Sequence, residues 1–130
     1  MLSARILDAN RTLLAEGDAG AISQFFTSDY RVHLTGRDMQ GGHEGVRKYL
    51  EMLARAFPSI QVDVEILVEA EDRIAWLRTL RGVQEGSIAG FPACGREIVW
   101  RDMVTSWFRG GLIAEEWVVT VLGERLLLAR

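Results

Sequence analysis

Apolar side chains recur at helical spacing in the first part of the chain. The spacing predicts an amphipathic helix over residues 3–16, which Gly17 ends, and a second, shorter helix over residues 19–27. The most regular helical pattern covers residues 43–56, and Pro58 prevents its continuation. One face of this third helix carries the apolar residues Val46, Tyr49, Leu50 and Leu53.

Beyond this helix the apolar residues fall at every second position, which is typical of a strand with one buried face. Strict alternation covers residues 60–69, and further strands are predicted over residues 74–84, 97–109 and 112–121. Gly110 and Gly111 separate the last two strands and predict a two-residue hairpin turn. The four strands therefore form an antiparallel meander.

The remaining segments complete a fold of the α+β class. A short strand is predicted over residues 30–34, loops over 35–42 and 85–96, and a terminal segment with helical character over 122–130. Helices that precede most of the strands favour α+β over alternating winding, and residues 1–130 fit one domain. With helices on one face of the sheet, the other face stays partly apolar, so we expect it to pair two copies in a homodimer.

Composition removes several classes of function. The 15 basic residues are scattered among 18 acidic ones at a net charge of -3, which disfavours a nucleic-acid partner. No apolar run approaches the ~20 residues of a membrane span, and the first ten residues lack a signal-peptide pattern, so we expect a cytoplasmic protein. The single cysteine, Cys94, and two distant histidines predict no disulfide, no metal site and no cofactor.

Several short segments, in their order and spacing, resemble the SnoaL-like polyketide cyclases of the nuclear-transport-factor-2-like superfamily. They are the helix start at residues 42–46, the helix end at 56–58, the glycine-rich loop at 86–92 with Gly95 and Arg96, and the hairpin at 110–117. These segments span most of the chain from about residue 30 to its end. The resemblance implies a cone-shaped barrel, with three N-terminal helices packed on a curved antiparallel sheet around a deep small-molecule pocket.

The resemblance also implies an activity, an intramolecular aldol ring closure that needs an acid/base group beside the reacting carbonyl. It places the family's acids on the last two strands, at the positions of Val104, Val118 and Val121 here. A valine cannot transfer a proton. Any chemistry in this chain must therefore use other side chains.

Two other residues are the catalytic candidates. Asp102 lies two residues from Val104 in an apolar and aromatic strand, so it shares the face that the resemblance assigns to the pocket. A regular hairpin would bring it near Val118 or Val119. The alternative is a surface ion pair of Asp102 with a neighbouring arginine. His33 lies in the short strand near the expected pocket mouth, where it could shuttle a proton or act only as a structural histidine.

The candidate ligand-binding residues are apolar or aromatic side chains that could equally be core. They are Phe26, Tyr49, Trp100, Val104, Trp117 and Val118, whereas Trp76 and Trp107 are expected in the core or at an interface. One of Glu115 and Glu116 must face inward in a regular strand.

Three hypotheses for function remain open. The first is a protein that binds a small apolar or polyketide-like molecule and catalyses cofactor-free cyclisation or isomerisation through Asp102, helped by His33. The second is a non-catalytic ligand-binding or dimerisation module of the same fold. The third is an epoxide hydrolase or dehydratase, for which the hydrolases' Asp-Arg-Asp set is poorly matched by Arg101 and Asp102, since neighbours on a strand point oppositely.

Overall fold

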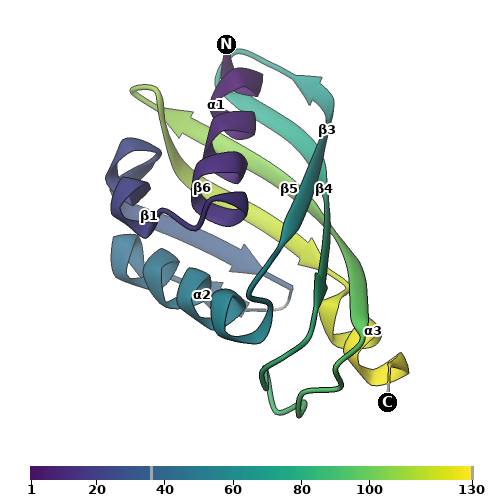
Figure 1. Ribbon diagram of the computed structural model, residues 1–130. Helices are drawn as coiled ribbons and strands as arrows, with labels where there is room; N and C mark the ends of the chain where they lie inside the picture. Colours follow the sequence, from purple (N-terminus) through teal and green to yellow (C-terminus); the bar gives the residue numbers. More distant parts are fainter. Residues whose placement is uncertain (36, 130) are drawn as a thin grey trace.

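A curved sheet of six strands forms the body of the protein (Figure 1). The computed structural model describes residues 1–35 and 37–129. Gly36, in the predicted loop 35–42, and Arg130, at the end of the predicted terminal segment, lie outside the described residues. The strand order is β2-β1-β6-β5-β4-β3, and the sheet is open rather than closed into a barrel. The strands are β1 (Phe26–Leu34), β2 (Arg37–Met39), β3 (Gln61–Glu69), β4 (Arg73–Val83), β5 (Glu97–Arg109) and β6 (Leu112–Thr120).

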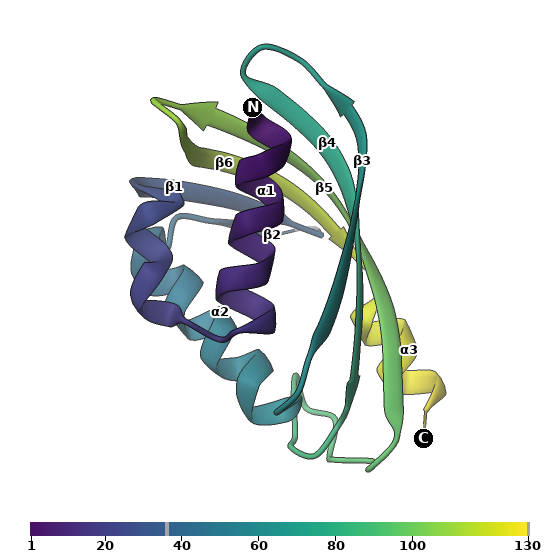
Figure 2. The same ribbon diagram turned by 45° about the horizontal axis from the view of Figure 1, so that its top comes forward.

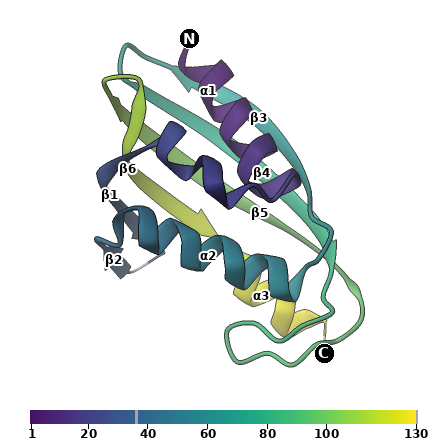
Figure 3. The same ribbon diagram turned by 60° about the vertical axis from the view of Figure 1, so that its left-hand side comes forward.

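Helices pack on the concave side of this sheet. The N-terminal helix begins as α1 (Leu2–Ala9) and continues as the π-helical segment η1 (Asn10–Ala15). The 3₁₀ helix η2 (Ala19–Gln24) and the longer α2 (Gly42–Ala56) follow, and Figures 2 and 3 show α1 and α2 lying across the same side of the sheet. The last helix, α3 (Leu122–Leu128), contacts β5. The predicted α+β class is confirmed.

Strands β3 to β6 form the predicted antiparallel meander. Gly110 and Gly111 join β5 to β6 with φ angles of 61° and 81°, a conformation that favours glycine at both turn positions. A β-bulge follows, because Phe108 pairs with Ile113 while Trp107 pairs with Glu115. The bulge shifts the rest of the hairpin by one residue.

The first strand differs from the sequence-based expectation. It begins at Phe26 instead of Tyr30, and it lies parallel to β6, so the sheet is mixed rather than purely antiparallel. The predicted helix over residues 19–27 ends earlier because Phe26 already belongs to this strand. The predicted loop 35–42 also contains a short edge strand, β2, which pairs with β1 at three positions.

Alternation along the strands divides the sheet into an inner face, turned to the helices, and an outer face. On β5 the inner side chains are buried and include Trp100, Asp102, Val104 and Ser106. On the outer face Met103 and Val119 are each 56% exposed. Pairing of this face with a second copy stays a prediction.

Two apolar clusters fill the space between the inner face and the helices. The larger joins α1, η1 and η2 to the middle of the sheet and contains Phe26, Val104 and Val118. The smaller lies at the C-terminal end of α2 and joins Leu53 and Phe57 to Trp100 and to Leu126 of α3. Within the described residues, 1–35 and 37–129, no helix is long and apolar enough to cross a membrane.

Candidate functional site

Asp102 is buried on the inner face of β5, as its alternation with Trp100 and Val104 predicts. Its side chain is 1% exposed. It pairs across the hairpin with Thr120, rather than with Val118 or Val119 as a regular hairpin would require. The one-residue shift comes from the bulge at Trp107 and Phe108. The alternative of a surface ion pair is therefore wrong, although Asp102 does have an arginine partner.

That partner is Arg78, which lies directly opposite Asp102 on the inner face of β4. Its Nε and Nη2 donate hydrogen bonds of 3.0 and 2.7 Å to one oxygen of the carboxylate, Oδ2. Its Nη1 donates to Oδ1 of Asn10, which is 5% exposed on the N-terminal helix, at 3.1 Å. Burial opposes the charge of the guanidinium, but the nearby Asp102 and Tyr49 raise the pKa of Arg78 above its ordinary value.

The second carboxylate oxygen of Asp102 is different. Within residues 1–35 and 37–129, no group forms a hydrogen bond with Oδ1, although this atom is fully buried. A buried carboxylate oxygen without a partner is costly, and native proteins rarely keep one unless it has a use. Oδ1 is therefore a buried acceptor that a bound molecule could satisfy.

A second polar chain runs through the inner face on the other side of the Val104–Val118 pair. Trp76 donates to Ser106 at 2.9 Å, Ser106 donates to one oxygen of Glu116, and Tyr30 donates to the other oxygen at 2.6 Å. Burial raises the pKa of Glu116, although the bonds from Ser106 and Tyr30 act in the opposite direction. Glu116 is thus the inward member of the acidic pair, and both of its oxygens are engaged.

Tyr49 comes from α2 and completes the polar region from the helical side. Burial raises the pKa of Tyr49 to about 12, with smaller effects from the charges of Arg78, Asp102 and Glu116. The phenol is therefore protonated at neutral pH and can donate a hydrogen bond. Tyr49 stays half-buried, as do Val46 and Leu50 of the same helix.

The three valines at the positions that the resemblance assigns to the family's acids do not share one environment. Val104 and Val118 are buried and pair with each other across β5 and β6. Val121 follows β6 and is 36% exposed. Asp102 and Glu116 flank the Val104–Val118 pair, each two residues along its strand. Two buried acids thus lie on the inner face beside the positions that the resemblance implies.

The predicted aromatic ligand contacts are divided between the two faces. Phe26 and Trp100 are buried on the inner side, where Trp100 lies 4.8 Å from the ring of Phe57. Trp117 is 36% exposed and lies on the outer face, 4.8 Å from Trp107. Trp117 therefore cannot line the same space as Asp102. The core prediction for Trp76 is confirmed, since it is 2% exposed.

His33 also lies on the outer face and does not meet Asp102. Its Nδ1 is 2.7 Å from Asp38, its Nε2 is 2.6 Å from Glu115, and its ring stacks on Trp117 at 4.6 Å. The hydrogen bonds to Glu115 and Asp38 raise the pKa of His33. The alternation of β1 turns Tyr30 and Val32 inward and His33 outward, so the predicted partnership of His33 with Asp102 is wrong.

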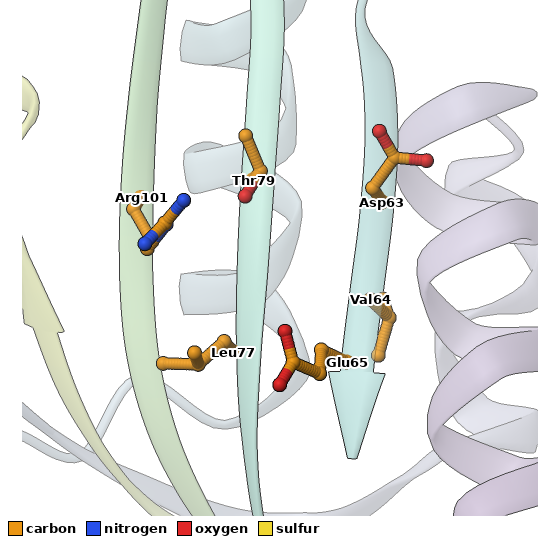
Figure 4. A pocket seen from close by; sticks show the side chains of 6 residues that line it. All are labelled: Asp63, Val64, Glu65, Leu77, Thr79 and Arg101. Carbon is orange, nitrogen blue, oxygen red and sulfur yellow. The ribbon is translucent and has the colours of Figure 1, made fainter. Parts of the chain in front are cut away.

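Two hollows lie on the surface, and one of them reaches Tyr30 of the second polar chain. One, of about 270 Å³, lies on the outer face between β3, β4 and β5, where Asp63, Glu65, Thr79 and Arg101 surround it with the helices behind the sheet (Figure 4). The other, of about 360 Å³, lies where β1 meets the start of α2. Neither contains Asp102 or Glu116. Arg101 points outward, so it cannot form a site with its neighbour Asp102.

Sequence reasoning did not select Arg78 or Asn10, although a signal existed for both. Arg78 alternates with Trp76 and Leu80 on the buried face of its strand, and Asn10 follows Ile6 by one helical turn on the apolar face of its helix. A lone polar residue on an apolar face needs a buried partner. Among residues 1–35 and 37–129, no group of three or more acidic, histidine or cysteine side chains is arranged to hold a metal ion.

Similarity to known proteins agrees with this architecture. AclR from Streptomyces galilaeus superposes with a TM-score of 0.83 at 24% identity, covering 97% of this chain and 81% of its own. A SnoaL-like polyketide cyclase from Agrobacterium tumefaciens gives 0.80 at 23% identity and 98% coverage of both chains. TsrD from Streptomyces laurentii gives 0.81 at 23% identity, with 95% and 93% coverage. No protein of curated function matches the chain. The sequence model of the SnoaL-like polyketide cyclases matches residues 4–120, and the chain therefore belongs to that family.

Proposed function

We propose that this protein is a cofactor-independent enzyme that moves a proton on a carbon atom beside a carbonyl group, with Asp102 as the base. The observation that carries the proposal is the buried Oδ1 of Asp102, which has no hydrogen-bond partner in the described part of the chain. The ion pair with Arg78 holds the other oxygen and keeps a charged carboxylate in a dry setting. A fixed, unsolvated base of this kind suits proton abstraction from a carbon acid.

In both proposed reactions, aldol closure and isomerisation, Asp102 accepts one proton from the substrate and later returns it. Asp102 Oδ1 takes a proton from the carbon, the C–H bond breaks, and its electron pair becomes an enolate. In an aldol closure the enolate carbon then bonds to a second carbonyl carbon, whose oxygen becomes an alkoxide. The protonated Asp102 returns the proton to that oxygen. Asp102 thus acts first as the base and then as the acid, and it ends in its starting state. In an isomerisation the same proton returns to a different carbon.

The polar groups beside Asp102 have supporting roles in this proposal. Tyr49 is protonated at neutral pH and can donate a hydrogen bond to the enolate or alkoxide oxygen. Glu116 is less suited to be the base, because Tyr30 and Ser106 already occupy both of its oxygens. The substrate is a small, largely apolar ketone or polyketide-like molecule, since Val104, Val118 and Phe26 supply apolar contacts nearby.

The test measures proton abstraction directly and does not need the natural substrate. The probe is the aromatic ketone 1-tetralone in D₂O, with deuterium exchange beside its carbonyl followed by NMR. We expect Asp102→Asn to lower the protein-catalysed exchange rate about 10²-fold or more, the usual contribution of a general base. The control is Asp63→Asn, which removes an exposed acid on the outer face and should leave the rate unchanged.

The same experiment separates catalysis from simple binding. Val104 and Val118, where the family's acids are implied, favour a non-catalytic binding module as the second candidate. If the wild type exchanges 1-tetralone no faster than Asp102→Asn, while both proteins show the same ligand-dependent change in tryptophan fluorescence, the enzymatic proposal fails and the binding module stands. The hydrolase alternative is weaker, because the second group on Arg78 is the amide of Asn10 rather than a second carboxylate.

A further inference from the structure

The N-terminal helix changes its winding where it meets the buried ion pair. It is α-helical to Ala9 and π-helical from Asn10 to Ala15, with the backbone N–H of Glu16 bonded to the carbonyl of Arg11 at 2.8 Å. A π segment inside a helix is rare and is frequently found at functional sites. Here it starts at the residue that touches Arg78.

The side-chain amide of Asn10 is held in one orientation. Its Nδ2 donates to the carbonyl of Ile6, one turn earlier, at 2.9 Å. With the amide nitrogen engaged there, Oδ1 faces Arg78 and accepts from Nη1 at 3.1 Å. Asn10 is therefore a fixed acceptor, 5% exposed, on the side of the guanidinium away from β5.

The ion pair beside this acceptor has an unusual geometry. Arginine and carboxylate groups commonly pair through two parallel hydrogen bonds, one to each carboxylate oxygen. Arg78 instead directs both Nε and Nη2 to Oδ2 of Asp102, at 3.0 and 2.7 Å, while Nη1 is committed to Asn10. Two-oxygen pairing would occupy Oδ1, the atom that the proposed function needs free.

We propose that Asn10 is a positioning residue that keeps Asp102 Oδ1 available by holding Arg78 in single-oxygen pairing. The effect of Asn10 on the pairing of Arg78 is inferred from the geometry of Asn10, Arg78 and Asp102 alone. Its effect on catalysis rests on the proposed function. Asn10 touches no reacting atom. Its effect reaches the substrate through the orientation of the guanidinium.

The first test is structural. Asn10→Leu keeps the size of the side chain and removes the acceptor, so the guanidinium is free to turn. A crystal structure of Asn10→Leu is expected to show Arg78 bonded to both oxygens of Asp102. An Arg78 that still bonds only to Oδ2 would overturn the inference, whatever the catalytic result.

The second test is kinetic and uses the 1-tetralone exchange assay. Asn10→Leu should lower the exchange rate about 10-fold, because two-oxygen pairing engages Oδ1, the atom that takes the proton. Leu13→Val is the matched control. It loosens the same π segment at a residue that is 5% exposed but is not bonded to Arg78, so it should lower the melting temperature and leave the exchange rate unchanged.

Comparison with Asp102→Asn distinguishes two kinds of failure. If Asp102→Asn loses exchange and Asn10→Leu retains the wild-type rate, the positioning role is wrong and the proposed function stands. If Asp102→Asn loses nothing, the proposed function is wrong, and the crystal structure of Asn10→Leu still decides whether Asn10 sets the pairing of Arg78.

Discussion

Arg78 contacts Asp102 through a single carboxylate oxygen, with hydrogen bonds of 3.0 and 2.7 Å that both end on Oδ2. The pair joins the neighbouring strands β4 and β5, on which the two residues lie directly opposite each other. In the described chain the remaining oxygen has no partner, so the site combines a well-held charge with an unused acceptor. This combination suits chemistry better than stability, because a fully satisfied pair would fix the core at lower cost.

Removing one partner of the Arg78–Asp102 ion pair should destabilise the fold strongly, whereas replacing both partners by apolar residues should destabilise it little. Arg78→Met leaves the carboxylate of Asp102 buried without its counter-charge, and we expect a loss of about 3–5 kcal/mol in the free energy of unfolding. The double variant Arg78→Met with Asp102→Leu should recover most of that loss. Urea denaturation measures both, with Arg101→Met on the exposed outer face as a control that changes stability by less than about 0.5 kcal/mol. Equal losses in the single and double variants would contradict this account.

Glu116 should make stability fall as the pH rises. Burial raises its pKa in the folded state above the ordinary 4.5, so the folded protein binds this proton more readily than the unfolded chain. The cost of ionising Glu116 is therefore absent below about pH 4.5 and grows as the pH rises through the folded pKa. Urea denaturation from pH 4 to pH 8 gives the free energy of unfolding of Glu116→Gln minus that of wild type. We expect this difference to become more positive as the pH increases. A difference that stays constant would contradict the raised pKa.

The sequence predicted the elements that local pattern controls. Strict alternation over residues 60–69 and the Gly110–Gly111 pair located the meander and its turn, because side-chain period and turn chemistry are local properties. The inward orientation of Asp102 followed from the same alternation. The resemblance to the SnoaL-like family, which the family match confirms, supplied the packing of helices on a curved sheet, although the sheet is open and mixed.

Other features depended on long-range contacts and could not be read from local pattern. The parallel pairing of β1 with β6 joins segments more than 80 residues apart, and it decides that His33 lies beside Trp117 on the outer face. One bulge at Trp107 and Phe108 moved Asp102 opposite Thr120. The partnership of Arg78 with Asn10 requires a helix and a strand 68 positions apart to meet.

Trp100 and Trp117, both predicted from the sequence as ligand-binding residues, should respond very differently to mutation. Trp100 is 2% exposed and packs on Phe57, so Trp100→Ala should cost about 3–5 kcal/mol in the free energy of unfolding. Trp117 is 36% exposed on the outer face, and Trp117→Ala should cost less than about 1.5 kcal/mol and leave 1-tetralone exchange unchanged. Urea denaturation and the exchange assay test this pair. A loss of exchange in a folded Trp117→Ala protein would mean that the outer face takes part in catalysis.

His33 should stabilise the fold at neutral and acidic pH and lose this effect at alkaline pH. Hydrogen bonds to Glu115 and Asp38 raise its pKa above the ordinary 6.5, so the folded state holds the imidazolium proton more tightly than the unfolded chain. The stabilisation is fully present below about pH 6.5 and disappears as the pH rises through the folded pKa. The side chain is 21% exposed, so solvent screening limits the effect to about 1 kcal/mol or less.

Titration of the His33 ring by NMR measures the raised pKa directly. Glu115→Gln should lower that pKa by removing the acceptor that contributes most, and Asp38→Asn should lower it by less. The free energy of unfolding of wild type relative to His33→Gln should be larger at pH 6 than at pH 9. If His33 titrates near 6.5 in the wild type, or if the advantage over His33→Gln is the same at both pH values, the two carboxylates do not hold a charged imidazole and β2 is attached to β1 by its backbone pairs alone.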